Sequence, residues 1–391
     1  MRLWPNRTDC PAPVNCSWGE LEHYLTDYFN GSDREPVPSE SLFPIPVLMG
    51  ITITCALLFL AGVTGNVMTI LVVSKYRDMR TTTNLYLCSM AVSDLLIFLC
   101  MPPDLYRLWK YRPWGFGDTF CKLFQFVSEC CTYSTILNIT ALSVERYLAI
   151  CFPLRAKRLV TKRRVRALIL FLWLVSLLSA GPVFILVGVE HETGPAAGNS
   201  GTAGVGGTER ETEMDTSECK TTQYAVESGL LAAMALVSSV FFFLPVFCLT
   251  VVYSLIGRRL WKRRRENNIG ANVAHRDKSN RQTVKMLAVV VFAFVLCWLP
   301  FHLQRYLMSR STEGSSPFWS FVTQYCSLVS TVLFYLSAAI NPVLYNTMSR
   351  KYRSAAAQLF GLKGDTSIQG RTASSVKGES SPAWTESTVS L

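Results

Sequence analysis

Seven long apolar runs alternate with short polar segments along this chain. The runs are Pro46–Val73, Thr82–Leu99, Leu123–Val144, Ala167–Val187, Ser228–Ile256, Met286–Gln304 and Phe321–Tyr345. Each is close to the length, about 20 residues, that a helix needs to cross the hydrocarbon of a membrane. Because a spanning segment must satisfy its backbone hydrogen bonds internally, and because the runs lack the alternation of a membrane barrel, we expect helices. The pattern predicts an all-α membrane protein, a seven-transmembrane helix bundle.

Basic residues gather in three of the segments between the runs. They are Lys75, Arg77 and Arg80 after the first run, Arg155, Lys157, Arg158, Lys162, Arg163, Arg164 and Arg166 after the third, and Arg258, Arg259, Lys262, Arg263, Arg264 and Arg265 after the fifth. Positive charge of this kind marks the cytoplasmic side, and the first 45 residues are instead rich in acids. We therefore expect the N-terminus outside the cell and the C-terminus inside. No charged and apolar leader precedes the first run, so we expect that run to act as the signal anchor.

The composition favours a membrane protein over a soluble one. Half of the 391 residues are hydrophobic and 17% are charged, whereas about 25% are charged in soluble proteins. A net charge of +11 could indicate a nucleic-acid partner. However, the basic residues lie between the runs, and no zinc-finger or RNA-binding signature accompanies them. We therefore expect no nucleic-acid partner.

Four parts follow from this organisation: an extracellular tail of residues 1–45, the bundle of residues 46–348, a short amphipathic eighth helix of residues 349–361, and a disordered cytoplasmic tail of residues 362–391. Asn6, Asn15 and Asn30 each begin an Asn-x-Ser/Thr motif in the outer tail, which predicts glycosylation there. The glycine-rich segment Gly194–Gly207 predicts disorder in the loop after the fourth run.

Two cysteines are placed to form a disulfide. Most of the 13 cysteines lie within the apolar runs, where a cysteine acts as a small buried hydrophobe. Cys121 lies at the outer end of the third run and Cys219 in the loop before the fifth, both on the oxidising side. Bridging them would hold that long loop across the mouth of the bundle, and the alternative is two unrelated free thiols. Cys10 and Cys16 could close a further small loop in the outer tail.

Asp94 is the one charged residue of the second run and lies near the middle of the membrane. A lone carboxylate there is costly, so it indicates a functional site. Asn66, Thr135, Ser337 and Asn341, in other runs, could face it and form a hydrated pocket that accepts a sodium ion. The alternative is a protonated acid with a purely structural role.

Glu145, Arg146 and Tyr147 stand together at the inner end of the third run. A Glu–Arg pair at a membrane boundary can be a simple surface ion pair. Here it opens onto the basic segment that follows the run. An arginine that a neighbour holds, and that helix movement releases, would make a switch.

Pro245, Pro300 and Pro342 each interrupt a run. Proline removes a backbone hydrogen bond and kinks a helix, which membrane helices tolerate. The residues beside two of these prolines indicate hinges rather than harmless kinks: Trp298 before Pro300, and Asn341 and Tyr345 around Pro342.

Together these residues resemble the signature set of class A, rhodopsin-like receptors. The matching positions, in order along the runs, are Asn66 in GNVMTILV, Asp94 in MAVSD, Glu145-Arg146-Tyr147, Trp173, Pro245, Phe294-x-x-Cys297-Trp298-x-Pro300 and Asn341-Pro342-x-x-Tyr345. The resemblance covers residues 47–360 and implies a receptor that activates a heterotrimeric G protein through Arg146, Tyr253 and Tyr345. Neither an enzyme nor a transporter is expected, because the four histidines are scattered and no repeat relates two halves.

Longer stretches are similar to one branch of this family, the growth hormone secretagogue (ghrelin) receptors, with motilin receptors as the nearest sibling. They include RTTTNLYLCSMAVSDLLIFLCMP, ITALSVERYLAICFPLRAK and LFYLSAAINPVLYN. The resemblance implies an acylated peptide hormone as ligand, a G protein of the Gq class with calcium release, no cofactor, and arrestin and receptor kinases acting on the tail. Receptors for amines carry an aspartate where this chain has Ser128, and opsins need a lysine that Gly314–Ser349 lacks, so neither ligand class is expected.

Glu129 and Arg305 are opposite charges in the outer parts of two runs. Either alone would be costly in a low-dielectric cavity, so we expect them to pair, and separate snorkelling to the surface is the alternative. In ghrelin receptors the matching pair divides the pocket into a side for the peptide and an apolar side associated with its acyl chain. The resemblance also assigns further pocket positions, which are Asp104, Arg107, Gln125, Phe301 and Phe334.

Three features depart from the ghrelin-receptor pattern. They are Thr331 where a pocket phenylalanine is expected, the insert Gly194–Gly207, and the pair Cys10 and Cys16. The threonine removes apolar area from the pocket. A receptor for a related gut peptide such as motilin, or a paralogue that responds poorly to ghrelin, therefore stays open.

Two expectations concern the inner side of the membrane. The inner part of the sixth run, Ser279–Val291, has no acid that could pair with Arg146, so we expect signalling without ligand. After the seventh run, Ser349–Phe360 is predicted to form an amphipathic helix on the membrane surface. Its side chains expected to be available to lipid are Tyr352, Leu359 and Phe360. The tail has no cysteine for a palmitoyl anchor.

Overall fold

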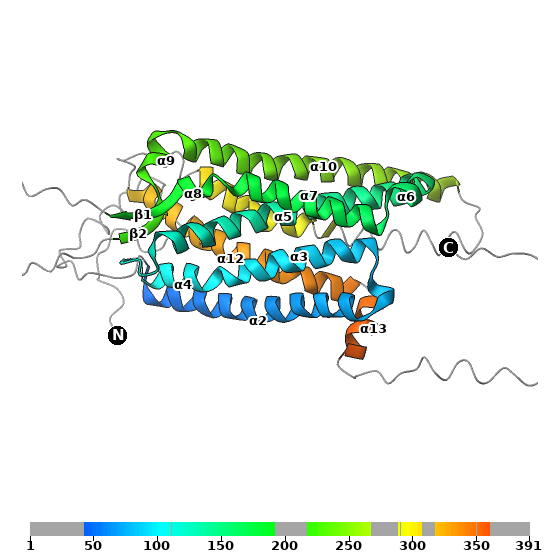
Figure 1. Ribbon diagram of the computed structural model, residues 1–391, viewed down its shortest axis with the longest axis horizontal. Coiled ribbons are helices and arrows are strands. Elements are labelled where there is room, and N and C mark those ends of the chain that lie inside the picture. The colour runs from blue at the N-terminus through cyan, green and yellow to red at the C-terminus, as the bar shows by residue number, and fades with distance from the viewer. Residues whose placement is uncertain are drawn as a thin grey trace, which may run out of the picture.

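The computed structural model describes residues 43–110, 112–191, 217–266, 288–289, 291–306, 317–348 and 350–359. Long helices run side by side along the molecule, with a small strand hairpin at one end and the short helix α13 crossing the other (Figure 1). We call these the strand end and the α13 end. Among the described residues each predicted run is helical over most of its length, so the predicted all-α bundle is confirmed. The predicted bounds are wrong in two runs: Ala167–Val187 is interrupted at Gly181 and Pro182 and its last residue begins a strand, and the helix predicted from Ser228 begins at Leu230.

The helices extend beyond the apolar runs. They are α2 (Ile45–Lys75), η1 (Arg77–Met79), α3 (Thr82–Leu99), α4 (Met101–Trp109), α5 (Gly117–Cys151), α6 (Pro153–Leu159), α7 (Lys162–Ala180), α8 (Val183–Leu186), α9 (Gln223–Glu227), α10 (Leu230–Glu266), α12 (Pro317–Met348) and α13 (Arg350–Leu359), and residues 291–306 are helical as well. The strands are β1 (Val187–His191) and β2 (Ser217–Thr221).

Within the described ranges, five helical segments are long and apolar enough to cross a membrane. They are Ile45–Lys75, Thr82–Trp109, Lys162–Leu186, Leu230–Lys262 and Phe321–Val343. Helix α5 is longer than any of these, at 35 residues, but its serines, threonines, Asn138 and two glutamates make it less apolar. The helix of the sixth predicted span, Met286–Gln304, is described continuously only from residue 291 to residue 306, so its described part is short.

The start of α7 shows why apolar runs underestimate helix length. The side chain of Thr161 accepts a hydrogen bond from the N–H of Arg164, which caps the helix at Lys162. The apolar run was predicted from Ala167. A capping side chain, rather than hydrophobicity, therefore decides where the first, basic turn lies.

The strand end carries an antiparallel hairpin that the apolar pattern did not predict. Strands β1 and β2 pair with Val189 opposite Cys219. The predicted disulfide is present and joins Cys219 to Cys121 near the start of α5, with Cα atoms 5.7 Å apart. The hairpin is thus fixed to the helix that carries Glu129.

Asp118 makes a second connection between α5 and the hairpin. Its carboxylate accepts a hydrogen bond from the N–H of Val189 at 3.0 Å and lies 2.6 Å from the Nζ atom of Lys122. The hydrogen bonds from Lys122 and Val189 hold the pKa of the Asp118 carboxyl below its usual range.

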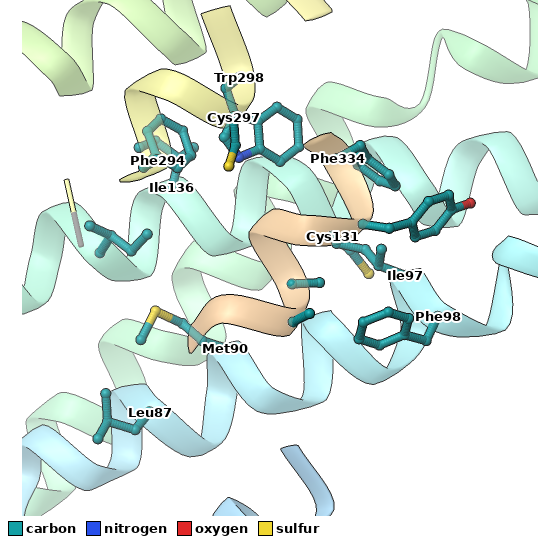
Figure 2. Close-up of a cluster of buried hydrophobic side chains, with 14 of the residues drawn as sticks. Leu87, Met90, Ile97, Phe98, Cys131, Ile136, Phe294, Cys297, Trp298 and Phe334 are labelled. Atoms are coloured by element: carbon teal, nitrogen blue, oxygen red, sulfur yellow. The ribbon is translucent and has the colours of Figure 1, made fainter. Parts of the chain in front are cut away.

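The middle of the bundle is packed with apolar side chains from several helices. Figure 2 shows Leu87, Met90, Ile97 and Phe98 of α3, Cys131 and Ile136 of α5, Phe294, Cys297 and Trp298 of residues 291–306, and Phe334 of α12. Helix α5 packs against α3, α7 and α10, and α2 packs against α3 and α12. This core fixes the spacing of the helices that carry the polar groups.

Helix α13 packs against the bundle differently from the prediction. The expectation that Tyr352 faces lipid is wrong: its ring is buried against Val72 and Met79, and its hydroxyl shares a 2.9 Å hydrogen bond with Thr69 of α2. Leu359 packs against the same cluster. Helix α13 crosses the end of α2 (Figure 1), and its Ala355 and Ala356 are buried in the same cluster as Val72 of α2.

Some predicted features lie outside the described residues. They are Asn6, Asn15 and Asn30, Cys10 and Cys16, the insert Gly194–Gly207, all but the last residues of Ser279–Val291, Phe360, and the tail 362–391.

Candidate functional site

The structure brings Glu129 and Arg305 together in the half of the bundle nearer the strand end. Arg305 Nη1, near the end of the helix of residues 291–306, donates a hydrogen bond to Glu129 Oε1 of α5 at 2.7 Å. The side chains are 11% exposed for Glu129 and 17% exposed for Arg305. Desolvation of a buried ion pair is offset only by good geometry and additional hydrogen bonds. The pair therefore depends on the groups around it.

Two neighbours of this pair were not predicted from the sequence. Tyr133, one turn further along α5, donates its hydroxyl hydrogen to the same Glu129 oxygen at 2.6 Å. Ser238 of α10 lies 3.4 Å from Arg305 Nη1 and accepts its hydrogen bond. Spacing of four residues on one helix face could have indicated Tyr133. No signal in the sequence singles out Ser238.

A second acid faces this end of the bundle from α4. Asp104 accepts a hydrogen bond from the hydroxyl of Tyr335 of α12 at 2.5 Å, and Arg107 Nη1 lies 3.9 Å from its other oxygen. The Arg107 guanidinium also lies over the ring of Phe124, 6.0 Å from its centre. Gln125, the remaining polar pocket position predicted, is half-buried on α5.

Aromatic side chains separate these charges from the middle of the bundle. Trp298 is buried and meets Phe301 edge-to-face, with ring centres 5.6 Å apart. It meets Phe334 in the same way, at 5.4 Å (Figure 2). Phe334 also meets the ring of Tyr335, at 5.1 Å. Ring contacts therefore run from the tyrosine that binds Asp104 to Trp298.

On the α13 side of Trp298 there is a small cavity of about 10 Å³, close to the space that one water molecule needs. Its lining residues are Thr135, Ile139, Ala293, Phe294, Trp298, Ser337, Ile340 and Asn341. The Thr135 hydroxyl and the indole N–H of Trp298 are buried, and neither has a hydrogen-bond partner among the described residues. Buried polar groups of this kind usually bind water or an ion.

Asp94 is connected to this cavity by Asn341, one of the residues that line it. The Asn341 side chain donates to Asp94 Oδ2 at 3.0 Å, and Asp94 is 1% exposed. Asn66 instead donates to the carbonyl oxygens of Gly62 and Ala338. The carboxylate and the neighbouring hydroxyl and amide oxygens are the ligand types that hard cations prefer.

The Glu145-Arg146-Tyr147 triplet lies at the α13 end of α5. Arg146 Nη2 donates to Glu145 Oε1 at 3.2 Å, and the hydroxyl of Thr82 donates to the same oxygen at 2.7 Å. The Tyr253 hydroxyl of α10 shares a 2.8 Å hydrogen bond with Ser143, two residues before the triplet. The structure thus holds the arginine by its neighbour and links α5 to α10 beside it.

The predicted hinge prolines lie inside continuous helices. Pro245 is within α10, Pro342 within α12, and Pro300 within residues 291–306. The backbone of Tyr345 is helical, and its side chain lies outside the part of the chain that the structure describes.

The chain resembles known receptors along most of its length. Residues 65–345 match the family described as 7 transmembrane receptor (rhodopsin family). The growth hormone secretagogue receptor type 1 of Rattus norvegicus is 60% identical over 359 residues, which cover 92% of this chain and 93% of that receptor. Its Homo sapiens counterpart is 61% identical over 349 residues, covering 89% and 90%. The motilin receptor of Homo sapiens is 48% identical over 345 residues, 82% of each protein.

These matches agree with the helix bundle and with the motif set. The matched proteins are receptors, not enzymes. The matched region begins within α2 and ends within α12, so it includes every helix that carries the site. The chain is therefore a multi-pass membrane protein and belongs to the rhodopsin family of seven-transmembrane receptors.

Proposed function

We propose that this chain is a plasma-membrane receptor for an acylated peptide hormone of the ghrelin type, with its strand end and N-terminus outside the cell. Identity of 60% and 61% to growth hormone secretagogue receptors, against 48% to a motilin receptor, supports this ligand class. The hormone binds in the pocket at the strand end. The basic loops at the other end receive a heterotrimeric G protein of the Gq class, which releases calcium.

The Glu129–Arg305 ion pair is the observation that carries the proposal. It joins α5 to the helix of residues 291–306 across the half of the bundle nearer the strand end. Polar pocket positions are available for a peptide at Asp104, Arg107 and Gln125, and aromatic surface at Phe301 and Phe334. Burying an acyl chain against such surface is worth about 0.8 kcal/mol for each methylene group. A divided pocket of this kind suits a ligand with a charged peptide and one apolar chain.

Calcium release in transfected cells tests the site. Glu129→Gln and Arg305→Gln each leave one buried charge unpaired, which costs about 3–5 kcal/mol in typical cases. We expect each variant to lose at least about tenfold in potency for acylated ghrelin, a loss of about 1.4 kcal/mol. Unacylated ghrelin, motilin and synthetic secretagogues serve as comparison ligands. Normal responses from both variants, at wild-type surface expression, would show that the pair does not form the pocket.

We further propose that Asp94, Thr135, Ser337 and Asn341 bind an allosteric sodium ion. The buried Asp94 carboxylate, the Thr135 hydroxyl, which has no hydrogen-bond partner in the described part of the chain, and the adjoining cavity support this. Replacing sodium chloride by choline chloride at constant ionic strength should raise agonist affinity in the wild type. Asp94→Asn should remove that sensitivity, and equal sodium sensitivity in both proteins would exclude the site.

The signal passes to the α13 end through a set of residues proposed to act as the switch. They are Trp298, the triplet Glu145, Arg146 and Tyr147, Tyr253, Asn341, Pro342 and Tyr345. Helix motion that frees Arg146 from Glu145 would open a surface for the G protein. We also propose that the receptor is glycosylated at Asn6, Asn15 and Asn30, and that its tail binds arrestin and receptor kinases.

One observation favours a second candidate ligand. Thr331, at a pocket position where a phenylalanine is expected, is half-buried and donates its hydroxyl hydrogen to Ser327 of its own helix at 2.9 Å. A smaller apolar surface suits a ligand without a long acyl chain. Stronger calcium release by motilin than by acylated ghrelin would favour this alternative.

A further inference from the structure

Glu129 Oε1 is the acceptor of two hydrogen bonds. Arg305 Nη1 donates to it at 2.7 Å and the Tyr133 hydroxyl at 2.6 Å. Tyr133 is 1% exposed, and its ring stacks on Phe241 of α10 with ring centres 4.3 Å apart and an interplanar angle of 25°. The tyrosine hydroxyl therefore cannot turn to solvent, and the packing of α5 against α10 sets its position.

Helix α10 also contacts the other member of the pair. Ser238, three residues before Phe241, is 1% exposed and lies 3.4 Å from Arg305 Nη1. One face of α10 thus supports Glu129 indirectly, through Tyr133, and Arg305 directly. Such additional hydrogen bonds offset the desolvation of a buried ion pair.

We infer that Tyr133 is a positioning residue of the proposed hormone pocket, because its hydroxyl fixes the Glu129 carboxylate. The Glu129–Arg305 ion pair then stays formed and separates the peptide side of the pocket from the acyl-chain side. Ser238 supports the arginine in the same way. This rests on the proposed function of the pair. Without the hydroxyl, the Glu129 side chain is free to change rotamer and Arg305 follows it. The ion pair then separates the two sides of the pocket less well.

Tyr133→Phe removes the hydroxyl and keeps the ring on Phe241. At matched surface expression, we expect the variant to lose about tenfold in potency for acylated ghrelin, the scale of a lost hydrogen bond to a charged group. A merely structural role would lower the response to acylated and unacylated peptide alike. We expect the ratio of the two potencies to narrow, and an unchanged ratio would overturn the inference.

A double-mutant cycle asks whether Tyr133 acts through the pair. If it does, Tyr133→Phe adds little once Arg305→Gln has broken the pair, because contacting residues are not additive. The matched control is Tyr335→Phe, which removes an equally buried hydroxyl that bonds to Asp104 instead. Its effect should add to that of Arg305→Gln. Full additivity for Tyr133→Phe would contradict the inference.

The same cycle can be measured without any ligand, as melting temperature in detergent. We expect Tyr133→Phe to lower the melting temperature by about 3 °C in the wild type and by clearly less with Arg305→Gln. Equal losses would overturn the inference. A wild-type receptor that does not respond to acylated ghrelin would overturn the proposed function instead, and this thermal cycle would still decide the role of Tyr133.

Ser238→Ala provides a second test in case Tyr133→Phe fails to reach the cell surface. The Ser238 hydrogen bond to Arg305 is longer than the Tyr133 hydrogen bond to Glu129. We therefore expect Ser238→Ala to narrow the acylated-to-unacylated potency ratio less than Tyr133→Phe does, by about threefold. No change in that ratio would contradict the support that α10 is inferred to give.

Discussion

At the scale of single residues, the charged groups inside this bundle are held by particular polar partners. Glu129 is held by Arg305 and Tyr133, Asp104 by Tyr335, and Asp94 by Asn341. An unpaired charge in a membrane interior is costly, so each carboxylate needs such a partner. Within the proposed pocket, the side chains that supply these partners also define where a ligand can place its own charges.

Thr331 gives a prediction at this scale. Thr331→Phe would add an aromatic surface of the kind expected for an acyl chain, so we expect potency for acylated ghrelin to rise about tenfold, from roughly 1.5 kcal/mol of extra apolar burial. Calcium dose–response curves at matched surface expression would measure this. Thr331→Val is the control, because it removes the hydroxyl without adding a ring.

The Thr331 prediction fails if the two variants respond alike. A gain shared by both would assign the effect to the lost hydrogen bond with Ser327 rather than to apolar area. A loss of potency in Thr331→Phe alone would mean that the ring blocks the pocket.

Residue types predicted the charged members of the site but not their supports. Glu129 and Arg305 were predicted because buried charges are conspicuous in apolar runs. Tyr133 and Tyr335 were missed, because a tyrosine within a span is equally compatible with plain packing. The spacing of four residues on α5 could have indicated that Tyr133 reaches Glu129. For Tyr335, only the positions of α4 and α12, which the sequence pattern does not specify, reveal that its hydroxyl reaches Asp104.

At the scale of elements, apolar runs predicted which segments are helical but not their ends or their contacts. Helix α7 begins earlier than its run because Thr161 caps it, and the hairpin pairs β1 with a strand more than 20 residues further along the chain. Helix α13 was predicted, but its apolar side packs on α2 instead of facing lipid. The cap of α7 is a local contact that hydrophobicity does not show, whereas contacts between distant segments decide the hairpin and the packing of α13.

Close packing of α2 gives a prediction at this scale. A Cβ atom at Gly62 would lie 2.1 Å from the ring of Phe98, whereas one at Gly50, on the same helix, would meet nothing within 4 Å. We expect Gly62→Ala to destabilise the receptor by about 1–3 kcal/mol through overpacking. Gly50→Ala should be neutral or stabilising, by up to about 1 kcal/mol.

Melting temperatures of the two alanine variants in detergent would measure the difference. Gly62→Ala should melt several degrees below Gly50→Ala. Equal melting temperatures would mean that Phe98 moves aside without cost and that the contact between α2 and α3 at this point is not tight.

At the scale of the whole molecule, the two ends of the bundle are connected by contacts that run through its core. Ring contacts lead from Tyr335 through Phe334 to Trp298, and the cavity beyond Trp298 leads to Asn341 and Asp94. At the α13 end, Glu145 alone is seen to hold Arg146 by a hydrogen bond among the described residues. We expect a bundle arranged in this way to change between its inactive and active states at little cost in free energy.

Ligand-free signalling is the prediction that belongs to this scale. Because Ser279–Val291 supplies no acid for Arg146, we expect inositol phosphate output clearly above that of mock-transfected cells without any hormone. Arg146→Ala should abolish it at equal surface expression. Output no higher than in mock-transfected cells would show that other contacts hold the inactive state.

The proposed pocket responds to an acylated peptide and distinguishes its acyl chain. Calcium release from cells expressing the unmodified chain tests this, with acylated and unacylated ghrelin compared over a full concentration range. We expect a saturable response to the acylated peptide and a potency at least about 100-fold lower for the unacylated one, a difference of about 2.7 kcal/mol. Equal potency of the two peptides, or no response to either at confirmed surface expression, would contradict it.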